Sequence, residues 1–324
     1  MKKLSMLFAL LLLCACAHST TDSGNGATAL DKYLKKVKVT HVMGEDAYFD
    51  TSSMRHGDDS LARKNGSNEL ITGVIEIPLP EVTTYVAVKD GKYEGTAMTF
   101  SKDGRLLAEE GYKNNLRNGI TRYYYENGDL MREIESKNHD VHGYIKEYYP
   151  GGQLKEIAHY KSGVLHGEEK RYYPDGKLQL ELNHKNGNPD GVIRSYYESG
   201  GVKMEMTYVQ GLVEGIAKEY YENGKVLGEV MYENDLRNGP AKTYYESGAL
   251  HEELSFVNDV IEGKNTEYRE NGTVSIIRNY VNGQPMGEQL AYFENGMISD
   301  RAIVDEKGIE VISYNSDGSV KERE

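Results

Sequence analysis

Glycine recurs at a fixed interval of 24 residues through most of this 324-residue chain. The first series comprises Gly95, Gly119, Gly143, Gly167, Gly191, Gly215, Gly239, Gly263 and Gly287. A second series follows nine residues behind the first, from Gly104 to Gly296, and neither series slips. A fixed period of this length is typical of repeat architectures, in which each unit contacts mainly its neighbours. The sequence therefore predicts nine full repeats and a half repeat over residues 91–318.

Other positions of the repeat are equally regular when the first glycine is numbered zero. Position five is Phe100 in the first repeat and Tyr in every later one. These tyrosines are Tyr124, Tyr148, Tyr172, Tyr196, Tyr220, Tyr244, Tyr268 and Tyr292. Position six is usually Tyr, position eleven is always Leu, Val or Ile, and position seventeen is mostly aromatic. Segments this rich in Tyr and aliphatic residues favour β-strands.

Positions eight and nine form a turn signal, as in Asn127-Gly128 and Asn223-Gly224. Such pairs tolerate the positive φ angles of a type I′ turn, which matches the twist of a β-hairpin. With this pair at the tip, position six faces eleven, three faces fourteen, and zero faces seventeen. Each repeat is therefore predicted to be one hairpin, and the ring at position seventeen to lie over the glycine.

The predicted register places opposite charges across from each other. Position three is basic and position fourteen is Glu in five repeats, giving the pairs Arg122–Glu133, Lys170–Glu181, Arg194–Glu205, Lys218–Glu229 and Lys242–Glu253. Each such cross-strand pair contributes about 0.2–1 kcal/mol. One face should carry the residues of positions six, eleven, fifteen and seventeen, and the other the charge ladder with the position-five rings. The predicted fold is all-β: an elongated, twisted antiparallel sheet of tandem 24-residue hairpins.

The beginning of the sequence predicts a lipid anchor. Lys2 and Lys3 precede an apolar run, Leu4 to Leu13, which is too short to span a bilayer. The stretch Leu13 to Cys16 resembles the lipobox of bacterial lipoproteins, with Cys16 as the acylated residue. Residues 1–15 would then be the signal peptide and 16–30 the lipidated Cys and a flexible tether. An ordinary signal peptide cut nearby is the alternative. Ala17 favours outer-membrane sorting in a Gram-negative host.

The remaining segments are less regular. Residues 31–90 contain two β-rich stretches, 70–77 and 83–88, and are interpreted as an N-terminal β-rich cap with a degenerate first hairpin. Residues 314–318 repeat the strand-and-turn signal, and residues 319–324 form a C-terminal tail. After removal of Cys14 with the signal peptide, no free thiol remains for a disulfide or a Cys-based metal site.

The repeat resembles the MORN-repeat variant family. The stretches that carry this resemblance are Tyr160 to Gly167, with Tyr-x-x-Gly-x-x-x-Gly spacing, and Tyr172 to Leu178, with Tyr-Tyr-x-x-Gly-x-Leu spacing. Bacterial members are often labelled antitoxins of toxin–antitoxin systems, and eukaryotic members are associated with membranes, phosphoinositides and scaffolding. The eukaryotic repeat is slightly shorter and often has Trp, which is absent from this chain.

The sequence shows no constellation typical of catalysis, and we expect neither enzymatic activity nor a cofactor. His142 and His166 precede the zero glycine, where other repeats have Asn, Asp or Glu, which indicates turn chemistry rather than a metal site. His159 and His184 should fall on opposite faces and cannot easily share an ion. The formal net charge of −13 argues against a nucleic-acid partner.

Two functions remain open. The first is a membrane-anchored envelope lipoprotein that acts as a scaffold for a protein or an envelope polymer. The second, implied by the resemblance, is an antitoxin or immunity protein that neutralises a toxin acting in the envelope. The row of position-five tyrosines is the candidate binding surface, although a stacked ladder that only holds the hairpins together would use the same rings.

Overall fold

The structure is a computed structural model that describes residues 27–45, 47–50, 60–67 and 69–321. Cys16, the predicted signal peptide and most of the tether lie outside these residues. The chain divides into two compact units, Met1–Gly152 and Gln153–Glu324. No helix among the described residues is long and apolar enough to span a bilayer.

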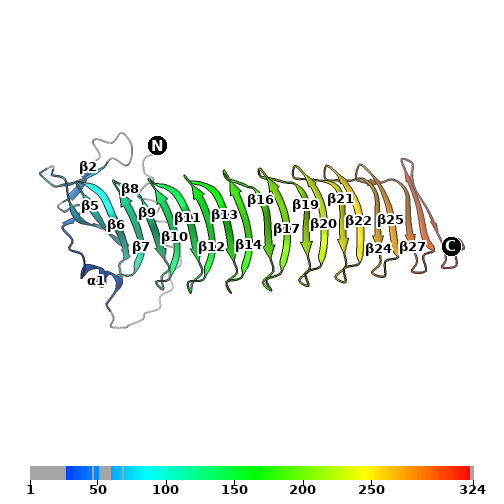
Figure 1. Ribbon diagram of the computed structural model, residues 1–324, viewed down its shortest axis with the longest axis horizontal. Coiled ribbons are helices and arrows are strands. Elements are labelled where there is room, and N and C mark those ends of the chain that lie inside the picture. The colour runs from blue at the N-terminus through cyan, green and yellow to red at the C-terminus, as the bar shows by residue number, and fades with distance from the viewer. Residues whose placement is uncertain (1–26, 46, 51–59, 68, 322–324) are drawn as a thin grey trace. The chain divides into compact units, whose positions relative to one another are not determined.

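The first unit is a sheet with a small N-terminal addition (Figure 1). Its elements are α1 (Ala29–Leu34), β1 (His41–Val42), β2 (Ala47–Asp50), β3 (Leu61–Lys64), β4 (Gly73–Pro78), β5 (Val82–Lys89), β6 (Lys92–Ser101), β7 (Leu106–Lys113), β8 (Leu116–Arg117), β9 (Gly119–Tyr124), β10 (Leu130–Lys137) and β11 (Asp140–Tyr148). Strands β4 to β11 pair antiparallel in chain order, and β1 adds to β4 in parallel.

The main hydrophobic core of the first unit lies where the N-terminal addition meets strands β4 to β6. Helix α1 is capped by Thr28, whose side chain and that of Asp31 form a capping box. Tyr33 of this helix packs against Tyr85 and Phe100, with both ring-centroid distances at 5.5 Å. The two β-rich stretches form β4 and β5, which pair as a hairpin. The core cluster comprises Ala47, Ala62, Ile71, Ile75, Val86, Val88 and Ala97.

The second unit consists of one antiparallel sheet, and every element described in this unit is a strand of that sheet. They are β12 (Leu154–Lys161), β13 (Val164–Tyr172), β14 (Leu178–Lys185), β15 (Asn188–Pro189), β16 (Gly191–Tyr196), β17 (Val202–Val209), β18 (Leu212–Val213), β19 (Gly215–Tyr220), β20 (Val226–Glu233), β21 (Leu236–Tyr244), β22 (Leu250–Val257), β23 (Val260–Ile261), β24 (Gly263–Tyr268), β25 (Val274–Val281), β26 (Gln284–Pro285), β27 (Gly287–Tyr292), β28 (Ile298–Asp305) and β29 (Gly308–Ser313). The predicted all-β fold of tandem hairpins is confirmed.

The central part of the predicted register is also confirmed. Gly191 pairs with Tyr208 and Arg194 with Glu205, as expected for positions zero with seventeen and three with fourteen. The five oppositely charged pairs all lie across from each other. Ion pairs form at Arg122–Glu133 (2.9 Å), Arg194–Glu205 (2.6 Å) and Lys218–Glu229 (3.8 Å). Lys170 instead contacts Glu168 at 3.0 Å.

The turn at positions eight and nine differs from the prediction. Gly200 donates its N–H to the Tyr197 carbonyl (2.8 Å), and Tyr197 donates to the Gly201 carbonyl (2.9 Å). The turn therefore spans positions six to nine, and only its glycine has a positive φ, +98° at Gly200. This pattern fits a type I turn followed by a glycine bulge, not a type I′ turn. The glycine is the last residue of the turn, and the predicted tip was one residue too late.

A second irregularity changes which residues share a face. Position five pairs with eleven, as in Tyr196↔Val202, whereas position four pairs with thirteen, as in Ser195↔Met204. Position twelve is therefore bulged. Because directly opposed residues lie on the same side of a sheet, positions five and eleven share a face. The prediction that six faces eleven, on the face of position seventeen, was wrong because a bulge interrupts the two-residue alternation of the strand.

The type I′ turns lie at positions nineteen and twenty, which sequence reasoning had not assigned. In one of them, Asn186 and Gly187 have φ angles of 54° and 89°, and the flanking Lys185 pairs with Asn188. In the second unit a short strand pairing flanks each of these turns, and a bulge that ends at the next zero glycine follows, as between Asn188–Pro189 and Gly191. Two tight turns per repeat, one at each end of the hairpins, therefore set the 24-residue period.

Candidate functional site

The position-five tyrosines lie beside the charge ladder, as predicted, and the hydroxyls of three of them are hydrogen-bonded within the sheet. The Tyr196 hydroxyl donates to Glu181 Oε1 at 2.6 Å, and Glu181 is the position-fourteen residue of the preceding repeat. The same bond joins Tyr244 to Glu229 (3.0 Å) and Tyr268 to Glu253 (2.7 Å). These tyrosines therefore link neighbouring repeats. Whether the row also binds a partner stays a prediction.

In the ladder, phenols and charged side chains of successive repeats contact one another. Arg194 lies 2.6 Å from Glu205 and 3.7 Å from Glu181, so it bridges two successive repeats. Desolvation, and then the hydrogen bond to Glu181, raise the pKa of Tyr196 to about 12. The phenol is therefore held neutral and donates to the carboxylate over the physiological range. We call the side of the sheet that carries this row the ladder face.

The position-six tyrosines form a second contact between repeats, which sequence reasoning missed. The Tyr197 hydroxyl donates to the Tyr220 carbonyl of the next repeat at 2.6 Å. Four other tyrosines do the same, Tyr125 to Tyr148, Tyr173 to Tyr196, Tyr221 to Tyr244 and Tyr245 to Tyr268. At the equivalent position Arg269 donates to the Tyr292 carbonyl. The repeated Tyr-Tyr pair was visible in the sequence, but its partner, a backbone carbonyl, was not.

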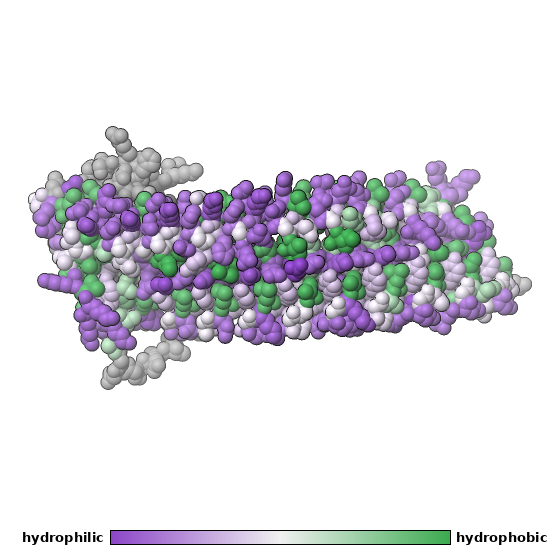
Figure 2. Space-filling model, in the orientation of Figure 1, coloured by the Kyte–Doolittle hydropathy of each residue, from purple (hydrophilic) through white to green (hydrophobic). Residues whose placement is uncertain are grey.

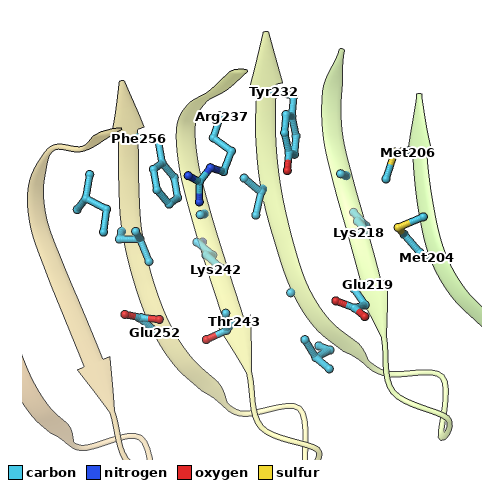
Figure 3. A pocket seen from close by; sticks show the side chains of 17 residues that line it. Met204, Met206, Lys218, Glu219, Tyr232, Arg237, Lys242, Thr243, Glu252 and Phe256 are labelled. Atoms are coloured by element: carbon cyan, nitrogen blue, oxygen red, sulfur yellow. The ribbon is translucent and has the colours of Figure 1, made fainter. Parts of the chain in front are cut away.

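The opposite side of the second unit, the hollow face, contains an open hollow of about 490 Å³. Its apolar lining comes from strands β17 to β23 and includes Met204, Met206, Val230, Leu254 and Phe256. In Figure 3, Tyr232, Arg237 and Phe256 lie toward one end of these strands, and Glu219, Thr243 and Glu252 toward the other. Apolar side chains also gather between rows of polar ones on the visible surface of this unit (Figure 2).

The two ends of the hollow differ in charge. At one end, the guanidinium of Arg237 lies 4.1 Å from the Phe256 ring centroid and 2.9 Å from Asp259, so its charge is already compensated. At the other end, Glu252 accepts a hydrogen bond from Asn265 (2.9 Å), and Glu219 is exposed. The hollow can therefore accept an apolar group, with carboxylates available to a cation at one end.

The histidines follow local structural roles. Asn186 donates its N–H to His166 Nδ1 at 3.4 Å, and in other repeats a carboxylate, such as that of Glu214, accepts the equivalent N–H. His184 is buried on the hollow face, where its Nε2 contacts Glu169 at 2.8 Å, whereas His159 is bonded to a carbonyl and is not buried. Among the described residues no cluster of three His, Cys, Asp or Glu side chains could hold a metal ion.

Fold and site together define a tandem β-hairpin repeat protein with an open sheet face. Six consecutive segments match the MORN repeat variant model, at residues 117–138, 141–162, 165–186, 189–210, 213–234 and 237–258. The repeat array therefore belongs to the MORN repeat variant family. The structure extends the same hairpin pattern beyond these segments, to β6–β7 before them and to β27–β28 after them.

No curated protein matches the chain. The Tc holotoxin pore of Photorhabdus luminescens matches 80% of this chain at 12% identity, with a TM-score of 0.18. A TcdB2–TccC3 structure matches 81% at 12% identity, with a TM-score of 0.15. The chain spans only 15% of the length of each. A protein from Lactobacillus plantarum matches 88% of this chain and is itself covered to 82%, at 11% identity and a TM-score of 0.13. TM-scores this low do not establish a shared fold.

Proposed function

We propose that this protein is a non-catalytic binding scaffold, anchored in the cell envelope through Cys16, that holds a protein or an envelope polymer on its repeat sheet. The observation that carries the proposal is the open hollow of the second unit, about 490 Å³, on a sheet that is one layer thick. The apolar residues of such a face are normally covered by a second layer, and among the described residues of this unit no such layer exists.

The repeats suit this role because they provide similar contacts at a regular spacing. Several weak contacts along neighbouring repeats add to a useful affinity, whereas catalysis needs one converging set of groups. The Met204 and Met206 side chains in the hollow can adapt to partners of different shape. The position-five tyrosine row, on the ladder face, is the other candidate surface.

The binding proposal is tested by affinity capture from the native host with the full-length protein. One variant carries Met206→Ser, Val230→Ser and Leu254→Ser in the hollow, and a second carries Tyr172→Ser, Tyr196→Ser and Tyr220→Ser. Folding of each is first confirmed by circular dichroism. A partner held in the hollow should be lost from the first variant and retained by the second. Capture of the same proteins and polymers by both variants and by the wild type contradicts the proposal.

The anchor is tested separately with Cys16→Ser. Several acyl chains on one Cys give stable membrane attachment, so the variant should become soluble or accumulate as an uncleaved precursor. Fractionation and mass spectrometry of the amino terminus distinguish these outcomes. A processed variant that stays in the membrane fraction like the wild type shows that Cys16 is not the anchor.

A further inference from the structure

A row of exposed aliphatic side chains runs along the ladder face of the second unit, beside the type I′ turns. Positions eighteen and twenty-one flank each turn and face each other, as in Val209↔Leu212 and Val257↔Val260. The aliphatic row is Val209 (49% exposed), Leu212 (39%), Leu236 (40%), Val257 (49%), Val260 (41%) and Val281 (46%). Positions seventeen and twenty-two line the hollow, so by strand alternation their neighbours eighteen and twenty-one point to the opposite face.

The hairpin does not need aliphatic residues at these positions. In earlier repeats of the same unit, position eighteen is Lys161 and Lys185, with the same turn and the same pairing. Lys185 there faces Asn188. Val has a higher strand propensity than Lys, but two Lys in equivalent hairpins show that this preference is not required. Aliphatic residues at these positions are therefore not a requirement of the fold, and in the earlier repeats only Val164, opposite Lys161 and 45% exposed, shares this character among the residues of β12 to β15.

Contacts between successive turns hold the members of the row side by side, with Glu233, opposite Leu236, as the one polar residue between Leu212 and Val281 at these positions. Asp235 donates its N–H to the Val213 carbonyl at 3.1 Å and accepts the Val213 N–H at 2.5 Å, which joins one turn to the preceding short strand. The same backbone bond joins Asp259 to the Arg237 carbonyl at 2.9 Å. Side chains on neighbouring strands of the row are thus separated by about one strand spacing, ~4.8 Å, and equivalent positions of successive repeats by about two, ~9.6 Å. Continuous apolar patches of more than a few hundred Å² mark interaction sites on soluble proteins.

Charges around the row indicate the kind of partner. Carboxylates at the same edge of the sheet are Glu214, Glu233, Asp235, Asp259 and Glu262, against the cations Arg237 and Lys264. Several of them accept hydrogen bonds from neighbouring donors. Asn234 donates its N–H to Glu214 at 3.0 Å, and the hydrogen bond from Arg237 lowers the pKa of Asp259. A second copy of this chain would bring an equally acidic edge and a net charge of −13, which disfavours self-association.

We propose that the aliphatic row is a second docking surface, for a polypeptide segment that presents aliphatic side chains to the row and Lys or Arg to its acidic edge. The segment gains apolar burial along Val209 to Val281 and electrostatic complementarity at the turns. This surface lies on the opposite face from the hollow and goes beyond the scaffold function proposed above. Loss of one surface leaves the other in place.

The test uses the full-length protein and a short fluorescent peptide of alternating Leu and Lys, with an alternating Leu and Glu peptide for comparison. The row variant carries Val209→Lys, Leu212→Asn, Val257→Lys and Val260→Asn, which are the residues of the equivalent hairpin at Lys185 and Asn188. The chain already accepts them at these positions, so the variant should fold. The control variant carries Ile309→Ser and Val320→Ser, which are also exposed, at 69% and 61%.

Fluorescence anisotropy should show that the Leu/Lys peptide binds the wild type and the control variant, and binds the row variant at least about tenfold more weakly. The Leu/Glu peptide should bind weakly to all three. Equal binding of the Leu/Lys peptide to wild type and row variant overturns the proposal, as does equal binding of both peptides to the wild type. A dimer in sedimentation that the row variant abolishes shows that the occupant is a second copy. The variant with Met206→Ser, Val230→Ser and Leu254→Ser in the hollow should still bind the Leu/Lys peptide. If only that variant loses binding, the peptide binds in the hollow and not on the row.

Discussion

Substitution of Gly191 separates two reasons for a glycine at position zero. The sequence predicted that Tyr208 lies over this glycine, so that a larger residue would displace the ring. The structure pairs the two residues, but a Cβ built at Gly191 has no heavy atom within 4 Å. The backbone, however, has a φ of +100°, which residues with a side chain rarely adopt. The requirement for glycine at this position is therefore conformational, and the overpacking explanation was wrong.

The magnitude follows from this distinction. A residue forced into a sparsely populated φ region costs about 1–3 kcal/mol. Because the space around the Cβ is open, Gly191→Ala and Gly191→Val should differ by no more than about 0.5 kcal/mol, the usual range of a surface change. Gly239 is the matched contrast. Its φ is +115°, but a Cβ there would lie 3.2 Å from Met231 Cγ and 3.3 Å from Met231 Cβ. Gly239→Val should therefore cost about 1–3 kcal/mol more than Gly239→Ala.

Thermal unfolding followed by circular dichroism measures the four variants. For a unit of this size the melting temperature should fall by about 2–4 °C for each kcal/mol. Repeat proteins can open locally, so hydrogen exchange should locate the loss of protection at the hairpin of the substituted glycine. An unchanged melting temperature for Gly191→Ala refutes the conformational argument. A Gly191→Val variant far less stable than Gly191→Ala restores the original explanation by ring contact.

Two further predictions concern the tyrosines. Tyr197→Phe removes the hydrogen bond to the Tyr220 carbonyl and should lower the free energy of unfolding by about 0.5–1.5 kcal/mol, as measured by urea denaturation. The control Tyr280→Phe, at position seventeen, should lower it by less. The second prediction concerns alkaline pH. The folded state raises the pKa of Tyr196, Tyr144 and Tyr124 from the ordinary tyrosine value of 10.0 to about 12, so it favours the neutral phenol. The stability that this provides is complete below about pH 10 and is lost as the pH rises toward 12. Phenolate absorbance should show that Tyr196 ionises at a lower pH in the Glu181→Gln variant than in the wild type. Identical titration curves for the two proteins contradict the Tyr196–Glu181 hydrogen bond.

The ladder illustrates what sequence reasoning could reach. The 24-residue period, the hairpin repeat and the pairing of Arg194 with Glu205 all followed from the chain alone. They did so because cross-strand pairing is local, and one correctly aligned charge pair fixes the register of its neighbours. The position-five tyrosines were placed on the correct face for the same reason.

The bulges are what sequence reasoning missed. An Asn-Gly pair suits the tip of a type I′ turn, but it equally suits a type I turn whose last residue is glycine. The local sequence does not distinguish these, whereas the Tyr197–Gly201 backbone bond does. The same limitation hid the type I′ turns at Asn186 and the other position-nineteen residues, although Asn186-Gly187 carries the same signal.

The sequence by itself determined the class of fold, because a repeat that recurs without a slip leaves one way to stack its hairpins. Only the tertiary structure decided what the two faces offer. Glycine bulges at positions zero and nine and the bulge at position twelve shift which side chains share a face, and Val230 lines an open hollow on one of these faces. Exposure of Val257 and its neighbours likewise depends on which elements lie over the sheet. Such properties arise between repeats, and a one-dimensional pattern of residue types does not contain them.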